Sequence, residues 1–105
     1  MPVDEVLYRR DTTLVRRLRL APGEMTPWHR DPFHRVTVVL GGDAITIEFR
    51  DGAQPESPPI AAGTTDWDEP TERVHRAVNV GRQVYEEITV FLLDHPDAVL
   101  QPTDG

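Results

Sequence analysis

The sequence of 105 residues contains no cysteine. Disulfide bonds and thiolate metal ligands are therefore excluded, so a metal site would have to use imidazole or oxygen ligands. A chain without cysteine also suits a reducing compartment, and we expect a cytoplasmic protein. Because this length is close to the commonest domain size, we expect a single domain over residues 1–105.

Positive charge is scarce as well, with eleven basic residues against eighteen acidic ones and a net charge of −7. This balance disfavours nucleic acid and anionic membrane surfaces as partners. No apolar run approaches the roughly 20 residues that a membrane-spanning helix needs, and residues 1–10 lack the charge order of a signal peptide. We therefore expect a soluble protein whose partner is a small molecule, not nucleic acid or a membrane.

No stretch in the middle of the chain has the pattern of a helix. Short runs of alternating apolar and polar residues are instead separated by Gly, Pro and Asp turns, which predicts an all-β barrel or sandwich. The core of this domain is expected at about residues 13–93, with an N-terminal strand before it and a short tail after it. The clearest strand-like runs are 13–21, 34–40, 44–50, 73–81 and 83–94.

The first of these runs, TLVRRLRLA, carries three leucines on one face, and Arg16 interrupts that face. We expect a half-buried strand whose arginines face water.

The last run, QVYEEITVFLLD, is apolar on both faces, as in a strand that is covered on both sides. Since a lone barrel would leave one face wet, we expect a homodimer. Glu86 and Glu87 have opposite parities, so one of them should face the interior.

Histidines and a carboxylate gather ahead of the second run. His29 and Asp31 are two residues apart, so both project to the same face if residues 28–32 are extended. Pro27 and Pro32 disfavour a helix there and permit that extended conformation.

Two further histidines matter because each lies in a strand-like run. His34 opens HRVTVVL, in which every second residue after it is aliphatic, so we expect His34 to point inward with them. His75 lies in RVHRAVNVG and shares its face with Asn79, whereas the valines lie on the other face, which argues mildly against an inward His75. Either these residues form a metal site inside a barrel, or the histidines only pack and form hydrogen bonds in the core.

Two stretches together resemble the motifs of the cupin family. GEMTPWHRDPFHRVTVVLG (23–41) is similar to the first motif, which has a glycine, a His-X-His pair, a glutamate and a second glycine. PTERVHRAVN (70–79) is similar to the second motif, in which a histidine is followed by an asparagine. The resemblance covers roughly residues 13–93 and is to small single-domain bacterial cupins. It implies a double-stranded β-helix, also called a jelly roll or cupin barrel.

The resemblance also implies a metal ion inside the barrel. His29 matches the first ligand and His75 the last, while Asp31 stands where a second histidine is usual and His34 where a glutamate is usual. Glu72 replaces the glycine of the second motif. We expect the three histidines to bind the ion and Asp31 to support one of them, with a site of two histidines and Asp31 as the alternative. One divalent transition metal, Fe, Zn, Mn or Ni, suits such ligands.

A cupin with this site is expected to be an enzyme of the dioxygenase, isomerase or decarboxylase type that acts on a small polar or anionic molecule. The alternative is a non-catalytic cupin that binds or senses a small molecule and has a degenerate metal site. Candidate residues of the substrate pocket are Trp28, Trp67, Asn79, Tyr85 and Glu87. Candidates for binding an anion are Arg30, Arg35 and Arg76, although their parity places them mostly opposite the histidines.

Overall fold

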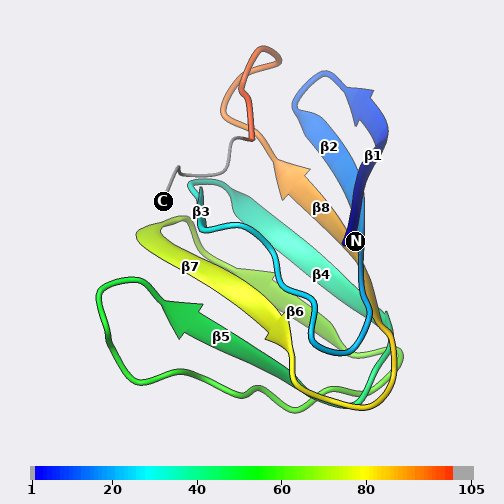
Figure 1. Cartoon of the computed structure of the whole chain (residues 1–105). Helices are drawn as coiled ribbons and strands as arrows, with labels where there is room; N and C mark the ends of the chain where they lie inside the picture. The colour runs from blue at the N-terminus through cyan, green and yellow to red at the C-terminus, as the bar shows by residue number, and fades with distance from the viewer. Residues whose placement is uncertain (1, 101–105) are drawn as a thin grey trace.

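The computed structural model describes residues 2–100, which form eight strands and no helix (Figure 1). The all-β prediction is confirmed. Within this range no helix has the length and apolar character needed to cross a membrane. The strands are β1 (Val3–Arg10), β2 (Thr13–Leu20), β3 (His29–Asp31), β4 (His34–Gly41), β5 (Ile45–Phe49), β6 (Thr65–Asp68), β7 (Thr71–Asn79) and β8 (Tyr85–Leu92).

The strands form two antiparallel sheets. The large sheet has the order β1-β2-β8-β4-β6, and the small sheet has the order β3-β7-β5. In Figure 1 the small sheet lies in front of β4 and β6, so the molecule has two layers. No ladder joins the two sheets among the described strands, and the jelly roll is therefore a sandwich of two sheets and not a closed barrel.

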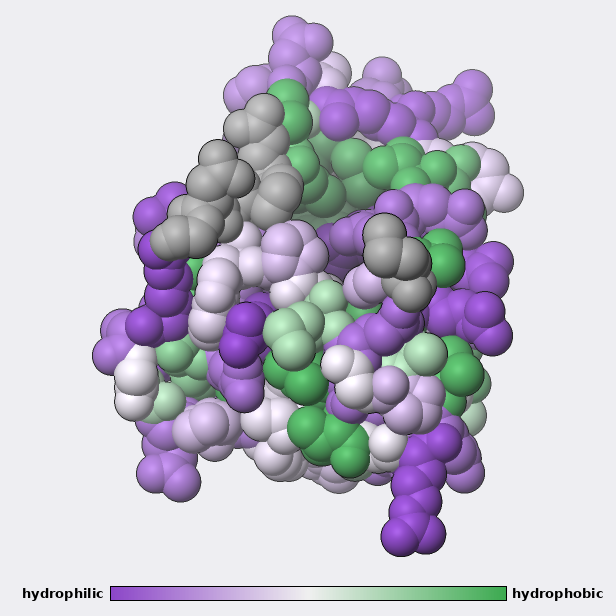
Figure 2. All heavy atoms as spheres, in the orientation of Figure 1, coloured by the Kyte–Doolittle hydropathy of each residue, from purple (hydrophilic) through white to green (hydrophobic). Residues whose placement is uncertain are grey.

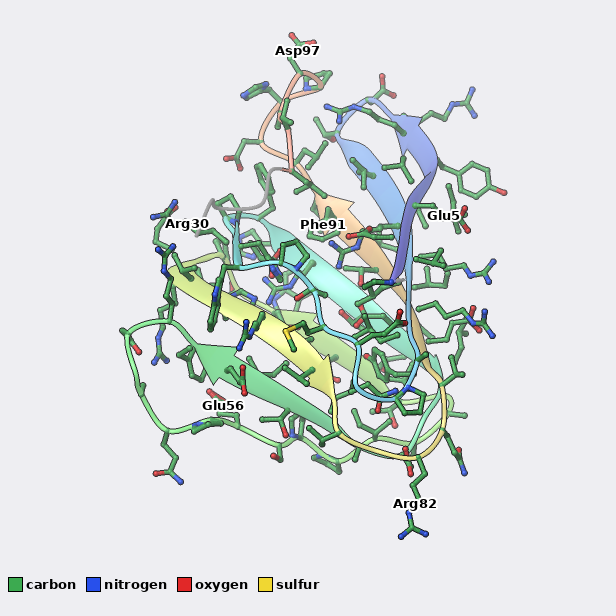
Figure 3. The ribbon with its side chains drawn as sticks, in the orientation of Figure 1. Glu5, Arg30, Glu56, Arg82, Phe91 and Asp97 are labelled. Carbon is green, nitrogen blue, oxygen red and sulfur yellow. The ribbon has the colours of Figure 1, made fainter. Side chains whose placement is uncertain are left out.

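Two apolar clusters form the core. One is built around Phe91, which is fully buried and lies on β8 in Figure 3. The other lies at the opposite end of β2 and β8. The members of the first cluster are Leu14, Phe33, Phe91, Leu93 and Ala98, and those of the second are Leu18, Leu20, Val39, Ile45 and Tyr85.

Strand β2 has the predicted apolar face, because Leu14, Leu18 and Leu20 are at most 2% exposed. The expectation that its arginines face water is wrong for Arg16, whose side chain is only 17% exposed. Arg16 shares the inward parity of the three leucines and lines the space between the sheets.

Strand β4 presents the opposite face to the interior from the one predicted. Val39 is buried, whereas Leu40 is 47% exposed and His34 is also exposed. Arg35, Thr37 and Val39 line the interior instead. The prediction failed because the inner wall of the large sheet is partly polar while its outer face is aliphatic, so alternation alone points the wrong way.

The two neighbouring glutamates of β8 point to opposite faces of the large sheet. Glu87 faces the interior, and Glu86 faces outward, where its Oε2 accepts a hydrogen bond of 2.8 Å from Arg17 Nε. As predicted, one glutamate of the pair is internal.

The turn between β4 and β5 requires glycine. Gly42 has a φ of +126°, and a Cβ atom there would lie 3.0 Å from Cδ1 of Tyr85. This glycine therefore lets the chain pass close to the buried Tyr85 ring as it crosses from the large sheet to the small one. The hairpin predicted at residues 41–43 is wrong, because β4 and β5 lie in different sheets and do not pair.

Asn79 joins three segments at the end of β7 and is 1% exposed. Its Nδ2 donates hydrogen bonds of 2.8 Å to the carbonyl oxygens of Leu20 and Gln83, and its Oδ1 accepts one of 2.9 Å from the backbone N–H of Gly81. Asn79 thus fixes the turn before β8 against the end of β2.

We expect Asn79→Ala to lower the free energy of unfolding by at least about 1–3 kcal/mol, because it leaves buried backbone groups without partners. Chemical denaturation would measure the change, and the neighbouring exposed Val80→Ala is the control, with an effect within about 0.5 kcal/mol. Equal stability of the two variants would show that Asn79 does not hold this junction.

Candidate metal centre

The candidate centre comes from the two neighbouring strands β3 and β7. His29 on β3 is the Cα partner of His75 on β7, and Asp31 is the partner of Thr71. Two steps along β3 thus match four along β7, and this irregularity brings Asp31 beside both imidazoles. His75 and Asp31 are 8% and 6% exposed. The valine parity that argued against an inward His75 was therefore misleading.

His29, Asp31 and His75, here called the triad, offer three ligand atoms that lie within 4.8 Å of one another. Asp31 Oδ2 is 2.9 Å from His75 Nε2 and 3.4 Å from His29 Nε2. The two imidazole centroids are 4.5 Å apart and the rings are tilted by 55°. The Nε2 atoms and the carboxylate oxygen therefore converge on one point.

Both imidazoles are oriented by backbone carbonyl groups. His29 Nδ1 is 2.7 Å from the oxygen of Pro27, and His75 Nδ1 is 2.9 Å from the oxygen of Arg73. Because a carbonyl oxygen only accepts, each Nδ1 carries the proton, and the neutral imidazole then presents its Nε2 lone pair to the Asp31 carboxylate. Lone pairs that face each other at 2.9 Å repel, so the triad needs a proton or a metal ion between them.

Electrostatics agree with a triad that attracts positive charge. Burial favours a raised pKa for Asp31, but hydrogen bonds from His29 and His75 and the charges of His29 and Arg35 outweigh it, so the pKa of Asp31 lies far below its usual range. Burial likewise lowers the pKa of His29, but the hydrogen bond and charge of Asp31 and the carbonyl of Pro27 reverse this and raise it above 6.5. Asp31 is thus a permanent carboxylate beside a readily protonated imidazole.

These features fit a transition metal ion. Two imidazole nitrogens and one carboxylate oxygen are common ligands of Fe, Zn, Mn and Ni, and each imidazole donates its other N–H to a carbonyl, as metal-bound histidines generally do. Three ligands from the protein would leave coordination positions free for water or a small molecule. The alternative set of two histidines and Asp31 is therefore the one that the structure brings together.

The structure does not bring His34 to the triad. His34 lies on the outer face of β4, where its Nδ1 is 2.8 Å from Glu69 Oε2 and its ring is 5.4 Å from that of Trp67. The prediction that three histidines form the site is thus corrected to a site of His29, Asp31 and His75. The physical cause is the reversed parity of β4, which points position 34 away from the interior.

A cavity of about 670 Å³, here called the main cavity, lies between the sheets beside the triad. Tyr85 and Glu87 line it, as expected of pocket residues. Trp28, Trp67 and Asn79 do not. Trp28 packs under the Arg76 guanidinium at 4.2 Å, Trp67 is 55% exposed on the outer face, and Asn79 is occupied by backbone groups.

Of the three arginines proposed from the sequence, only Arg35 lines the main cavity, with Nη2 3.8 Å from Asp31 Oδ2. Arg30 points outward (Figure 3) and donates a hydrogen bond to the Glu72 carbonyl, while Arg76 pairs with Glu48 at 2.7 Å. Arg16 also lines the main cavity, and sequence reasoning missed it. The signal was present, because Arg16 interrupts the leucine face of its strand.

Known structures identify the fold. A cupin domain from Bordetella pertussis aligns with a TM-score of 0.76 at 19% identity, over 87% of this chain and 92% of that one. An uncharacterised protein with a double-stranded β-helix domain from Klebsiella pneumoniae gives 0.73 at 20% identity, over 99% and 85%. The chain has the cupin fold. No family model and no curated protein matches the sequence.

A third similar structure is an oxalate oxidase in complex with the substrate analogue glycolate, with a TM-score of 0.60 and 22% identity. The alignment covers 85% of this chain but only 46% of the oxidase, so this chain spans about half of that protein. At such identities the likeness establishes the fold alone.

The triad predicts a pH dependence for the metal-free protein. Since the pKa of His29 is raised on folding, its contribution to stability is complete below about 6.5 and is lost as the pH rises through the folded value. In the presence of a chelator, the free energy of unfolding should therefore fall as the pH rises above about 6.5, and it should fall less in His29→Gln. Denaturation curves at several pH values would measure both slopes, and equal slopes would contradict the coupling.

Proposed function

We propose that this cupin binds one divalent transition metal ion and acts as an enzyme on a small polar or anionic molecule. The observation that carries the proposal is the convergence of two imidazole nitrogens and a carboxylate on one point beside the main cavity. An ion there would act as a Lewis acid and position a small ligand. Consistent with the absence of cysteine, we propose the cytoplasm as its compartment.

The oxalate oxidase supports the class of ligand but not a particular reaction. The structure of that enzyme contains the substrate analogue glycolate, a small carboxylate, in the same fold. Enzymes of the oxygenase, isomerase and decarboxylase types remain the candidates. Oxygen uptake and product formation with a panel of small carboxylic acids would separate catalysis from the alternative function of binding alone.

The opposite wall of the main cavity carries a group suited to proton transfer. Glu87 Oε1 accepts a hydrogen bond of 2.8 Å from the Tyr85 hydroxyl, and Glu87 Oε2 accepts one from Thr89. Burial, together with the charge and hydrogen bond of Glu87, raises the pKa of Tyr85 far above its usual value. Tyr85 therefore stays protonated and orients Glu87, which we propose as the base or acid of the site.

Metal content tests the proposal. Protein purified without a His tag and loaded with Zn, Fe, Mn or Ni should hold one ion per chain. His75→Ala and Asp31→Asn should weaken metal binding by more than about 100-fold, since loss of a supporting group alone typically costs about 10–100-fold. The matched control is His34→Ala, which removes an imidazole outside the triad and should keep the ion.

Elemental analysis after dialysis, with chelator competition for the affinity, gives both readouts. Loss of the ion from His34→Ala together with its retention in Asp31→Asn would restore the three-histidine site. Wild-type protein that holds no ion after loading would refute the metal proposal.

We also propose a homodimer that forms through the outer face of the large sheet. The cross-strand register aligns one row of side chains across all five strands, and a second row beside it is partly aliphatic. The first row is Tyr8, Val15, Val90, Val36 and Trp67, and the aliphatic part of the second is Ile88 and Val38. Large apolar patches that stay exposed are unusual in monomers.

Charge on this face supports a second copy as the partner. Arg17 is paired with Glu5 at 3.5 Å and with Glu86 at 2.8 Å, so neighbouring charges are already neutralised. Four strands of eight residues and the shorter β6, about 4.8 Å apart, present a flat area of roughly 500 Å² before the relief of the side chains is added. A standard interface buries roughly 800 Å² of accessible surface per partner, so most of this face would take part.

Val90→Glu should convert the dimer into a monomer, because it places a charge in the centre of the row. Sedimentation velocity at micromolar concentration would measure the change, and Val80→Glu, at an exposed position after β7, is the control. A monomeric wild-type protein at that concentration would contradict the dimer.

A further inference from the structure

Arg16 is the unusual side chain of the interior. It is a full positive charge on the leucine face of β2, its side chain is 17% exposed, and its guanidinium lies 5.0 Å from the centroid of the buried Phe91 ring. Its Nε is buried and has no hydrogen-bond partner among residues 2–100. Since an unpaired buried donor of a charged group is costly, this group calls for an acceptor.

The other two arginines of the main cavity are already engaged. Arg35 lies 3.8 Å from Asp31 and 3.9 Å from Asp68, and Arg73 pairs with Asp51 at 3.6 Å and stacks on Phe49 at 3.8 Å. Within the described part of the chain, Arg16 has one ion pair, with Asp4, whose Oδ1 is 3.5 Å from Nε and whose side chain is 44% exposed at the sheet edge. Arg16 is therefore the cavity arginine with donor capacity left for a ligand.

The position of Arg16 links it to the triad. A second cavity of about 330 Å³, here called the side cavity, lies under the β1–β2 hairpin, and Arg16, His29 and Asp31 line both cavities. Figure 2 shows apolar surface in the hollow between this hairpin and the end of β8. The side cavity is lined there by Val6, Leu14, Val99 and Leu100. Arg9 and Arg30 also line the side cavity, but each donates to backbone carbonyl groups, Arg9 to Pro96 and Ala98 and Arg30 to Glu72. A small molecule at the triad thus meets aliphatic walls and the guanidinium of Arg16, whose Nε has no hydrogen-bond partner among residues 2–100.

We propose that Arg16 binds the carboxylate of a small aliphatic acid whose second polar group reaches the triad. A guanidinium presents two parallel N–H donors that match the two oxygens of a carboxylate, and this pairing is strong where water is excluded. Two of the acidic residues that line the main cavity have other partners, since Glu87 accepts hydrogen bonds from Tyr85 and Thr89 and Asp68 faces Arg35. The ligand class is a small hydroxy or amino acid, with the hydroxyl or amine toward the metal. This inference deepens the proposed function and rests on it for the second contact only.

Binding of lactate, followed by NMR or calorimetry, tests the assignment, and lactamide is the uncharged probe of the same shape. Wild-type protein should bind lactate and should bind lactamide much more weakly. Arg16→Gln should weaken lactate binding by about 10–100-fold. Arg16→Lys keeps the charge but loses the two parallel N–H donors, so its affinity for lactate should lie between those of wild type and Arg16→Gln. The matched control is Arg19→Gln, on the exposed face of the same strand, which makes the same change in net charge.

Metal content separates this inference from the proposed function. Arg16→Gln should hold one ion per chain like wild type, so its loss of affinity for lactate reports on the guanidinium alone. In His75→Ala the metal contact is absent, and Arg16-dependent binding of lactate should persist with lower affinity. If wild type takes up no metal but lactate still depends on Arg16, the metal proposal fails and the carboxylate site stands.

Three results would overturn the inference. These are equal affinities of wild type and Arg16→Gln for lactate, equal affinities of wild type for lactate and lactamide, and no binding of lactate by wild type. Thermal unfolding shows whether each variant is folded. Should Arg16→Gln not fold, Arg16→Lys and the comparison of lactate with lactamide on wild type still decide the matter.

Discussion

One constraint shapes the interior of this protein: a buried carboxylate is held between two imidazoles whose protons are already committed to backbone carbonyls. Asp31 lies 2.9 Å and 3.4 Å from the Nε2 atoms of His75 and His29. Without a positive charge at their meeting point, these groups repel one another. The short strand β3, its irregular pairing with β7 and the prolines at both ends of it all serve to hold this arrangement.

The rest of the fold buries most of the triad and leaves room beside it. Two apolar clusters close the opposite ends of the sandwich, so the polar side chains between them enclose a cavity and do not collapse on it. The triad lies on the small sheet, and Arg16 and Glu87 lie on the facing wall of the large sheet. A small molecule in the main cavity would thus be contacted from two rigid layers, the usual condition for precise positioning.

The sequence predicted the architecture well, because Gly, Pro and Asp turns delimit short alternating runs. The two motifs placed His29, Asp31 and His75 correctly in the triad. The prediction that His34 points inward was wrong, because both faces of β4 are partly apolar. The alternation of residues therefore cannot tell which face lines a polar cavity and which lies on the outside of the sheet. The prediction that Asn79 lines the substrate pocket was wrong for a related reason. An asparagine whose amide forms hydrogen bonds with buried backbone groups has the same sequence pattern as one that contacts a ligand. The inward position of Arg16 was indicated in the sequence only by its interruption of the leucine face of β2.

The central claim is that an ion binds between His29, Asp31 and His75. Crystals of untagged protein loaded with Zn or Co, with diffraction recorded at the absorption edge of the metal, test this most directly. The account predicts one anomalous peak per chain within about 2.0–2.2 Å of the Nε2 atoms of both histidines and of an Asp31 oxygen. A peak at His34 and Glu69 instead, or no peak at the triad, would contradict it.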